Sequence, residues 1–193
     1  MTASKKALWT VAVILLILLA DQTLKIWVKT HMQLGEDIPL TSWFHIRFIE
    51  NNGMAMGIQV FGKLFLTIFR IVASTAIAYY LYQLIRNKFK LSYILLVAMI
   101  FAGAVGNIID SVFYGVVFNN GSWLRGEVVD MFYFPLFSFK WPSWMPWIGG
   151  STFEFFRYIF NLADASISVG IIVLLLFFRK TLSSSFEKQE IEN

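Results

Sequence analysis

The sequence contains four apolar segments that are each long enough to cross a lipid bilayer, which takes about 20 residues. They lie at about residues 8–28, 60–85, 92–114 and 157–180. The chain as a whole is 58% hydrophobic, which is typical of an integral membrane protein and not of a soluble domain of this size. We therefore predict a single all-α membrane domain with four transmembrane helices.

Positive charges between the apolar segments predict how the chain is oriented. They are concentrated before the first segment, between the second and third, and after the fourth: Lys5, Lys6, Arg86, Lys88, Lys90, Arg179 and Lys180. Cytoplasmic loops carry an excess of Lys and Arg, so we expect both termini in the cytoplasm. The loops at 29–59 and 115–156 then face outward, and the Ser- and Glu-rich tail at 181–193 is expected to be disordered.

The two outer loops differ in composition. The alternation in Phe44-His45-Ile46-Arg47-Phe48 predicts short strands at the membrane surface. The second loop is interrupted by Gly and Pro and contains four tryptophans: Trp123, Trp141, Trp144 and Trp147. Tryptophan is enriched at membrane–water interfaces, so we expect this loop to lie on the bilayer.

Several kinds of chemistry are excluded or disfavoured by residues that the chain lacks. It has no cysteine, and His31 and His45 are its only histidines. A disulfide, a thiol nucleophile and a Cys-ligated metal are therefore excluded, and a His-based zinc site or a Ser-His-Asp triad is disfavoured. No polybasic patch for nucleic acid is present. We predict no cofactor and no metal, so any chemistry must use carboxylates, amides, hydroxyls or Lys and Arg.

Asp130 and Asp164 are the sharpest candidates for that chemistry, because both lie beside strongly apolar sequence. A carboxylate in such surroundings is costly unless it has a partner or a function. Two carboxylates that share one proton can activate water while polarising a carbonyl oxygen. The alternative is that each aspartate caps a helix or pairs with a basic residue.

Amide and carboxylate side chains recur at a spacing of three residues, which places them on one face of a helix. Asn161 precedes Asp164 in this way, and Asn107 precedes Asp110. We expect a polar network across the helix bundle, which would either orient catalytic groups or pack polar helix interfaces.

Three further polar features have weaker interpretations. Asp21 and Lys25 are spaced for an intrahelical ion pair, or Asp21 holds the first helix against its neighbours. Asn51 and Gly53 begin a segment of small residues that is read either as a turn or as backbone that pairs with an extended peptide. Arg70, inside the second apolar segment, is read either as pairing with a carboxylate or as extending toward a lipid head group.

These residues together resemble the lipoprotein signal peptidase (signal peptidase II) family, the bacterial membrane aspartyl peptidases. Five blocks occur in the family's order: Asp21-Gln22-Thr23-Leu24-Lys25, Asn51-Asn52-Gly53-Met54-Ala55-Met56-Gly57, Gly103-Ala104-Val105-Gly106-Asn107-Ile108-Ile109-Asp110, Val128-Val129-Asp130 and Phe160-Asn161-Leu162-Ala163-Asp164. The resemblance implies four transmembrane helices with a small outer β-cradle and a membrane-surface helix or loop, partly within 31–59. It also implies cleavage of prolipoproteins just before a diacylglyceryl-modified cysteine.

The resemblance also assigns roles to residues. Asp130 and Asp164 match the catalytic pair, and Asp21 and Lys25 match a block with structural or lipid-contacting roles. The positions that match the substrate cleft are Asn51, Gly53, Asn107, Asp110 and Asn161. The implied partners are diacylglyceryl-modified prolipoproteins, membrane lipids and the inhibitor globomycin. The implied location is the bacterial inner membrane, with the active site at its outer face.

Three departures from the family's pattern stand out. Ser111 follows Asp110 where the family usually has Arg, and Arg125 or Arg157 is a possible replacement. Met54-Ala55-Met56 replaces the usual Ala-Ala-Phe, which could reshape the cleft wall. The outer loop is longer than usual, and the Trp-rich stretch 135–150 is expected to form a lid or a membrane-surface flap.

Two other functions are weaker readings of the same residues. A proton-coupled carrier also uses intramembrane carboxylates, but it predicts acids near the midplane and usually an internal repeat. Here the acids lie near the outer ends of the segments, and we find no repeat. A membrane scaffold needs no paired acids. Globomycin binding separates a signal peptidase from both alternatives.

Overall fold

The computed structural model of the chain describes residues 1–52 and 62–192. The chain divides into two compact units. The first, here called the helical unit, comprises Met1–Leu24, Asn52–Val128 and Leu162–Asn193. The second, here called the strand unit, comprises Lys25–Asn51 and Val129–Asn161. Each unit is described by itself.

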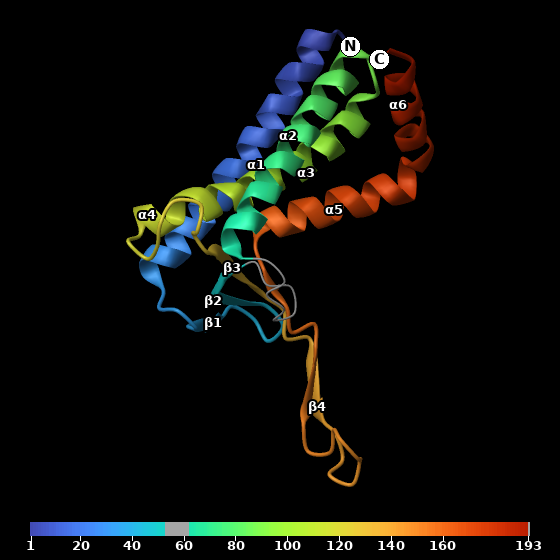
Figure 1. Cartoon of the computed structure of the whole chain (residues 1–193). Coiled ribbons are helices and arrows are strands. Elements are labelled where there is room, and N and C mark those ends of the chain that lie inside the picture. The colour runs from blue at the N-terminus through green and yellow to red at the C-terminus, as the bar shows by residue number, and fades with distance from the viewer. Residues whose placement is uncertain (53–61, 193) are drawn as a thin grey trace. The chain divides into compact units, whose positions relative to one another are not determined.

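Most of the described residues are helical. The helices in chain order are α1 (Ala3–His31), α2 (Lys63–Arg86), α3 (Leu91–Ile109), the π-helix η1 (Asp110–Tyr114), α4 (Gly115–Val117), α5 (Leu162–Phe177) and α6 (Arg179–Glu192). Three helical stretches are long and apolar enough to cross a membrane: α1, α2, and the continuous run from α3 through η1 to α4. A fourth span results if α5 and the start of α6 count as one, although they are bent by 92° (Figure 1).

The last helical region differs from the sequence-based expectation at both of its ends. The predicted segment 157–180 starts as a helix only at Leu162, because Ile159–Phe160 is a strand. The predicted disorder of the tail 181–193 is wrong over most of its length, since α6 runs to Glu192. The start of α6 is held by the hydroxyl of Ser185, which is 1% exposed and hydrogen-bonds the hydroxyl of Tyr80 on α2.

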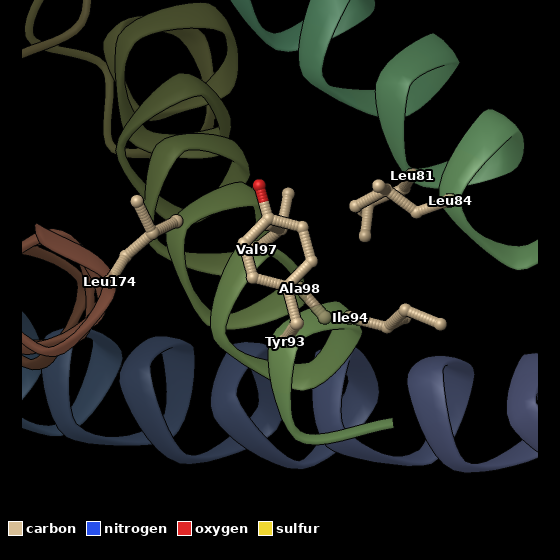
Figure 2. Packing of buried hydrophobic residues seen from close by; sticks show 7 residues of the cluster. All are labelled: Leu81, Leu84, Tyr93, Ile94, Val97, Ala98 and Leu174. Carbon is tan, nitrogen blue, oxygen red and sulfur yellow. The ribbon is translucent and has the colours of Figure 1, made fainter. Parts of the chain in front are cut away.

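The apolar core of the helical unit is centred on α3. Figure 2 shows Leu81 and Leu84 of α2 on one side of α3 and Leu174 of α5 on the other. The cluster consists of Leu81, Leu84, Tyr93, Ile94, Val97, Ala98 and Leu174. Because α3 is covered by two neighbours, 44% of its most apolar stretch is buried, compared with 11% for α1. The exposed apolar side chains of α1, such as Leu16 and Leu19, are those expected to face lipid.

The strand unit contains two small sheets. The first has the order β1-β2-β3-β6, formed by β1 (Asp37–Pro39), β2 (His45–Asn51), β3 (Val128–Tyr133) and β6 (Ile159–Phe160). The second is the antiparallel pair β4 (Phe137–Lys140) and β5 (Thr152–Phe155). The short strand predicted from the alternation around His45 is confirmed as β2. The membrane-surface helix expected within 31–59 stays a prediction, because residues 53–61 lie outside the described residues.

Candidate active site

Asp130 lies on β3, an inner strand of the four-stranded sheet, and receives a hydrogen bond from an amide on each side. Strand β3 has β2 and β6 as its neighbours in the sheet. Asn51, the last residue of β2, donates from Nδ2 to Asp130 Oδ2 at 3.0 Å. Asn161, directly after β6, donates from Nδ2 to Asp130 Oδ1 at 2.7 Å. The carboxylate is 2% exposed, and each of its oxygens has an amide donor that fixes its orientation.

Asn161 is fixed in turn by the strand that carries Asp130. Its Nδ2 also donates to the backbone oxygen of Val129 at 3.2 Å, and the residue is fully buried. Strand β6 pairs antiparallel with β3, with Phe132 opposite Phe160. The register of this short pairing therefore decides that the residue after Phe160 reaches Asp130.

Asp164 lies in the helical unit, in the first turn of α5. Asn107 on α3 donates from Nδ2 to Asp164 Oδ1 at 2.8 Å. A carboxylate in the first turn of a helix is also favoured by the helix dipole. Asp164 is half-buried, so it differs from Asp130 in exposure but shares the feature of an asparagine donor.

A second polar cluster of the helical unit is centred on Gln22 of α1. Its Nε2 donates to Asp110 Oδ1 at 3.0 Å and to the backbone oxygen of Gly106 at 3.2 Å. Its Oε1 accepts a hydrogen bond from the Tyr114 hydroxyl at 3.0 Å. Asp110 is fully buried, so Gln22 supplies a donor that its carboxylate needs. This cluster joins α1 to the α3–η1 region.

Asp21 connects the same helix to the start of α5. Its Oδ1 accepts a hydrogen bond from the backbone N–H of Ala163 at 2.9 Å. The first N–H groups of a helix have no partner within the helix, so Asp21 caps α5 from a different helix. This hydrogen bond joins α1 to the start of α5. The ion pair with Lys25 stays a prediction.

The π-helix η1 holds the segment of the chain that precedes β3. Its wider turn leaves carbonyl groups available, and the backbone N–H groups of Leu124 and Gly126 bond the oxygens of Val112 and Ser111 at 3.2 and 2.8 Å. A Cβ atom on Gly126 would come within 2.1 Å of the backbone oxygen of Asp110. Only glycine fits this close approach, which leads the chain directly into Val128 at the start of β3.

Ser111, which follows Asp110 in η1, contacts an arginine from elsewhere in the chain. Arg70 on α2 donates from Nη1 to Ser111 Oγ at 2.9 Å, and Ser111 donates to the backbone oxygen of Asn107 at 2.8 Å. Arg125 and Arg157, the two candidates suggested by the sequence, both have exposed side chains. The guanidinium beside position 111 is therefore that of Arg70.

Comparison with known proteins identifies the family. A model of the family described as signal peptidase (SPase) II matches residues 13–180. This chain belongs to the signal peptidase II family. It is 46% identical to the lipoprotein signal peptidase of Porphyromonas gingivalis over 188 residues, covering 89% of this chain and 83% of that protein. It is 36% identical to that of Amoebophilus asiaticus over 200 residues, covering 97% and 84%.

The fold also matches that of a solved structure. A bacterial membrane enzyme matches with a TM-score of 0.66 and 26% sequence identity, covering 91% of this chain and 90% of that one. With its membrane-spanning helices and bacterial relatives, this signal peptidase II family member is a bacterial membrane protein.

The three-residue spacing predicted that Asn161 and Asp164 act together, and likewise Asn107 and Asp110, but the members of each pair have different partners in the structure. Asn161 precedes α5 and does not share a helical face with Asp164, because it belongs to the strand unit and bonds Asp130. Asn107 and Asp110 also have different partners, Asp164 and Gln22. Gly53 lies outside the described residues.

Two participants were not recognised from the sequence. Gln22 directly follows Asp21 in the sequence. An amide side chain inside an apolar helix often bonds a neighbouring helix, and this could have indicated its role. Arg70 was noted from the sequence as a charged residue inside an apolar segment, but nothing local to it in the sequence indicates Ser111 as its partner. Among the described residues, no three His, Cys, Asp or Glu side chains gather as metal ligands would.

Proposed function

We propose that this protein is a membrane aspartic endopeptidase that removes signal peptides from bacterial prolipoproteins. It cuts just before a cysteine that already carries diacylglycerol. The observation that carries the proposal is the fixed carboxylate of Asp130, oriented by Asn51 and Asn161 within the family's Val-Val-Asp block. The names of the relatives, lipoprotein signal peptidases, supply the substrate class.

In the proposed mechanism Asp130 and Asp164 act as a pair. One is ionised and takes a proton from water, while the other is protonated and polarises the scissile carbonyl. Water attacks the carbonyl carbon, and the tetrahedral intermediate then collapses as a proton passes to the leaving amine. The proposal assigns the roles of base and acid to the pair and not to individual residues.

The asparagines have a positioning role in this proposal. Asn51 and Asn161 are already hydrogen-bonded to Asp130, and Asn107 to Asp164. Amide donors hold a carboxylate in one rotamer without supplying a charge that would permanently neutralise it. Proton transfer requires the reacting groups to be held at hydrogen-bonding distance of the substrate, and these donors restrict the orientation of both carboxylates.

Substrate binding in the proposal follows from the apolar surface of the helical unit. The signal peptide arrives within the bilayer, and its diacylglyceryl chains stay in lipid beside the helices. Asp110 and Gly53 belong to the expected cleft on the basis of the resemblance, whereas Asp21 maintains the helix packing around it. The site operates at the outer face of the inner membrane, and globomycin is expected to block it.

The proposal is tested by a gel-shift cleavage assay on a diacylglyceryl-modified prolipoprotein, with thermal unfolding as the check on folding. Asp130→Asn and Asp164→Asn keep the side-chain shape and remove the charge. Each folded variant is expected to lose activity by several orders of magnitude. Asp37→Asn makes the same chemical change at an exposed position of the strand unit and should cleave at the wild-type rate.

Each alternative outcome has a distinct meaning. If either aspartate variant cleaves at a near-normal rate, the catalytic pair is misassigned, and Asp110 becomes the next residue to test. If the wild type itself does not cleave the prolipoprotein and does not bind globomycin, the signal peptidase proposal is wrong for this chain.

A further inference from the structure

Strands β4 and β5 form an antiparallel hairpin with two chemically different faces. The pairs are Phe137 with Phe155, Ser138 with Glu154, Phe139 with Phe153, and Lys140 with Thr152. Because side chains alternate between the faces of a strand, the four phenylalanines share one face. The opposite face carries Ser138, Lys140, Thr152 and Glu154.

The aromatic side chains of this hairpin contact one another in a continuous ladder. Phe137 stacks on Phe155 with ring centroids 4.8 Å apart, and Phe139 contacts Phe153 at 5.1 Å. Trp141 extends the row, with its ring 4.8 Å from that of Phe139. Cross-strand aromatic pairs stabilise a sheet, so the ladder keeps the aromatic face continuous.

This face is exposed along its whole length. Every residue of both strands is exposed, and Phe137 retains 53% of its accessible surface. A two-stranded hairpin alone is marginally stable in water, and a contiguous exposed apolar patch of this kind marks an interaction surface. An apolar face backed by a polar face is the pattern of an element that lies flat on a boundary between apolar and aqueous phases.

The loop that joins the two strands is ordered and rich in tryptophan. The backbone N–H of Trp141 bonds the oxygen of Ser151, and that of Gly150 bonds the oxygen of Trp141, both at 3.0 Å. Trp144 and Trp147 are 79% and 102% exposed. Trp side chains concentrate at membrane–water interfaces, because the ring is apolar and its N–H needs a polar partner.

A short segment of the chain joins the hairpin to α5, the next helix in the sequence. Strand β5 ends at Phe155 and α5 begins at Leu162, so the intervening segment spans no more than roughly 25 Å even when fully extended. The lipid–water boundary is therefore within reach. The exposed charges of the two strands, Lys140 and Glu154, cancel, which is compatible with a zwitterionic surface and gives no electrostatic reason for a charged protein partner.

We propose that the aromatic face of the β4–β5 hairpin lies on the lipid–water interface of the leaflet at which α5 begins. The four phenylalanines and Trp141 face the acyl-chain boundary, and the Ser, Thr, Lys and Glu side chains of the other face point toward water. The hairpin is thus a second membrane-binding element, independent of the transmembrane helices. This inference does not depend on the proposed peptidase activity.

The absence of cysteine from the chain allows a direct test. Phe139→Cys and its neighbour Ser138→Cys each introduce the only thiol, which is labelled with a nitroxide in protein reconstituted into phosphatidylcholine nanodiscs. Collisions with oxygen, which dissolves in lipid, and with a water-soluble nickel chelate are then measured. The ratio of oxygen to nickel accessibility is expected to be several-fold higher at position 139 than at 138. The pair Phe153→Cys and Thr152→Cys repeats the comparison on the other strand.

Two results would overturn the proposal. Equal access of the nickel chelate to positions 138 and 139, and to 152 and 153, would show that both faces are in water. Exclusion of both reagents at 139 and 153 would show that protein, either a partner or a second copy, covers the aromatic face in place of lipid. Circular dichroism and thermal unfolding of each labelled variant verify that the fold is retained.

Discussion

Replacing Gly103 by alanine should test how closely α3 and α5 pack, because this glycine lies directly against the start of α5. A Cβ atom at position 103 would be 2.3 Å from the backbone oxygen of Ala163 and 2.8 Å from Cγ1 of Ile167. Ordinary van der Waals contact begins at about 3.4 Å. The obstacle is backbone and not the end of a flexible side chain, so the two helices must separate by about 1 Å.

Two effects on stability oppose each other. Alanine gains about 1 kcal/mol over glycine in a helix interior, whereas overpacking costs about 1–3 kcal/mol. We expect the upper end of that cost because a carbonyl is in the way, which leaves a net loss of about 2 kcal/mol. For a chain of this size that lowers the Tm by roughly 4–8 °C.

The same displacement should affect the site. Asn107 lies one turn after Gly103 on α3, and its 2.8 Å bond to Asp164 would lengthen toward about 3.8 Å, beyond hydrogen-bonding distance. A misplacement of about 1 Å can cost roughly 100-fold in rate. Thermal unfolding and gel-shift cleavage measure the two effects. Gly121→Ala is the control, since its Cβ would be 3.5 Å from the nearest atom. Wild-type Tm and rate in Gly103→Ala would refute the close packing of α3 on α5.

Three further predictions follow from single contacts. Asp21→Ala removes the acceptor for the N–H of Ala163 and should lower stability by about 0.5–2 kcal/mol; Asp21→Asn keeps an acceptor oxygen and should lose less in the same thermal unfolding measurement. Ser111→Arg places a second guanidinium beside that of Arg70, a repulsion of about 4 kcal/mol at an effective dielectric constant near 20. The double variant Arg70→Ser/Ser111→Arg should restore the Tm, and a double variant no more stable than Ser111→Arg alone would contradict this reasoning. Asn161→Ala removes one of the two amide donors to Asp130 and should reduce kcat in the cleavage assay while KM changes little; a changed KM with normal kcat would assign Asn161 to substrate binding.

The helices were predictable from the sequence because apolar runs of this length have few alternatives. Their ends were harder to predict. Ile159 and Phe160 are as apolar as the helix that follows, so composition did not reveal that they pair with β3. The tail looked polar enough to be disordered, yet its first turns contain Leu182, which packs against the helical core, and Ser185, which bonds Tyr80.

The candidate residues were predictable individually, but most of their pairings were not. The three-residue spacing of Asn161 and Asp164 predicted that they share a helix face. That prediction was wrong because α5 begins only at Leu162, after Asn161. Long-range contacts such as those of Arg70 with Ser111 and Gln22 with Asp110 leave no local trace in the sequence. The hairpin is different, since the alternation Phe137-Ser138-Phe139-Lys140 is a readable strand pattern within a region that was expected to be a lid or a membrane-surface flap, with no strands predicted in it.

The capping of α5 by Asp21 has a consequence for biogenesis. The ribosome makes α1 first and α5 last among the spans, so Asp21 enters the membrane long before the N–H group of Ala163 exists. Until then its carboxylate is an expensive group in an apolar medium, and α1 remains poorly suited to a final position in lipid. Docking of α5 reduces that penalty by adding the Ala163 N–H as a donor to Oδ1, while the Gln22 amide of the same helix is the donor to Oδ2. Nascent chains that stop before Leu162 should therefore remain recognisable to membrane quality control, whereas full-length chains escape it once α5 has docked.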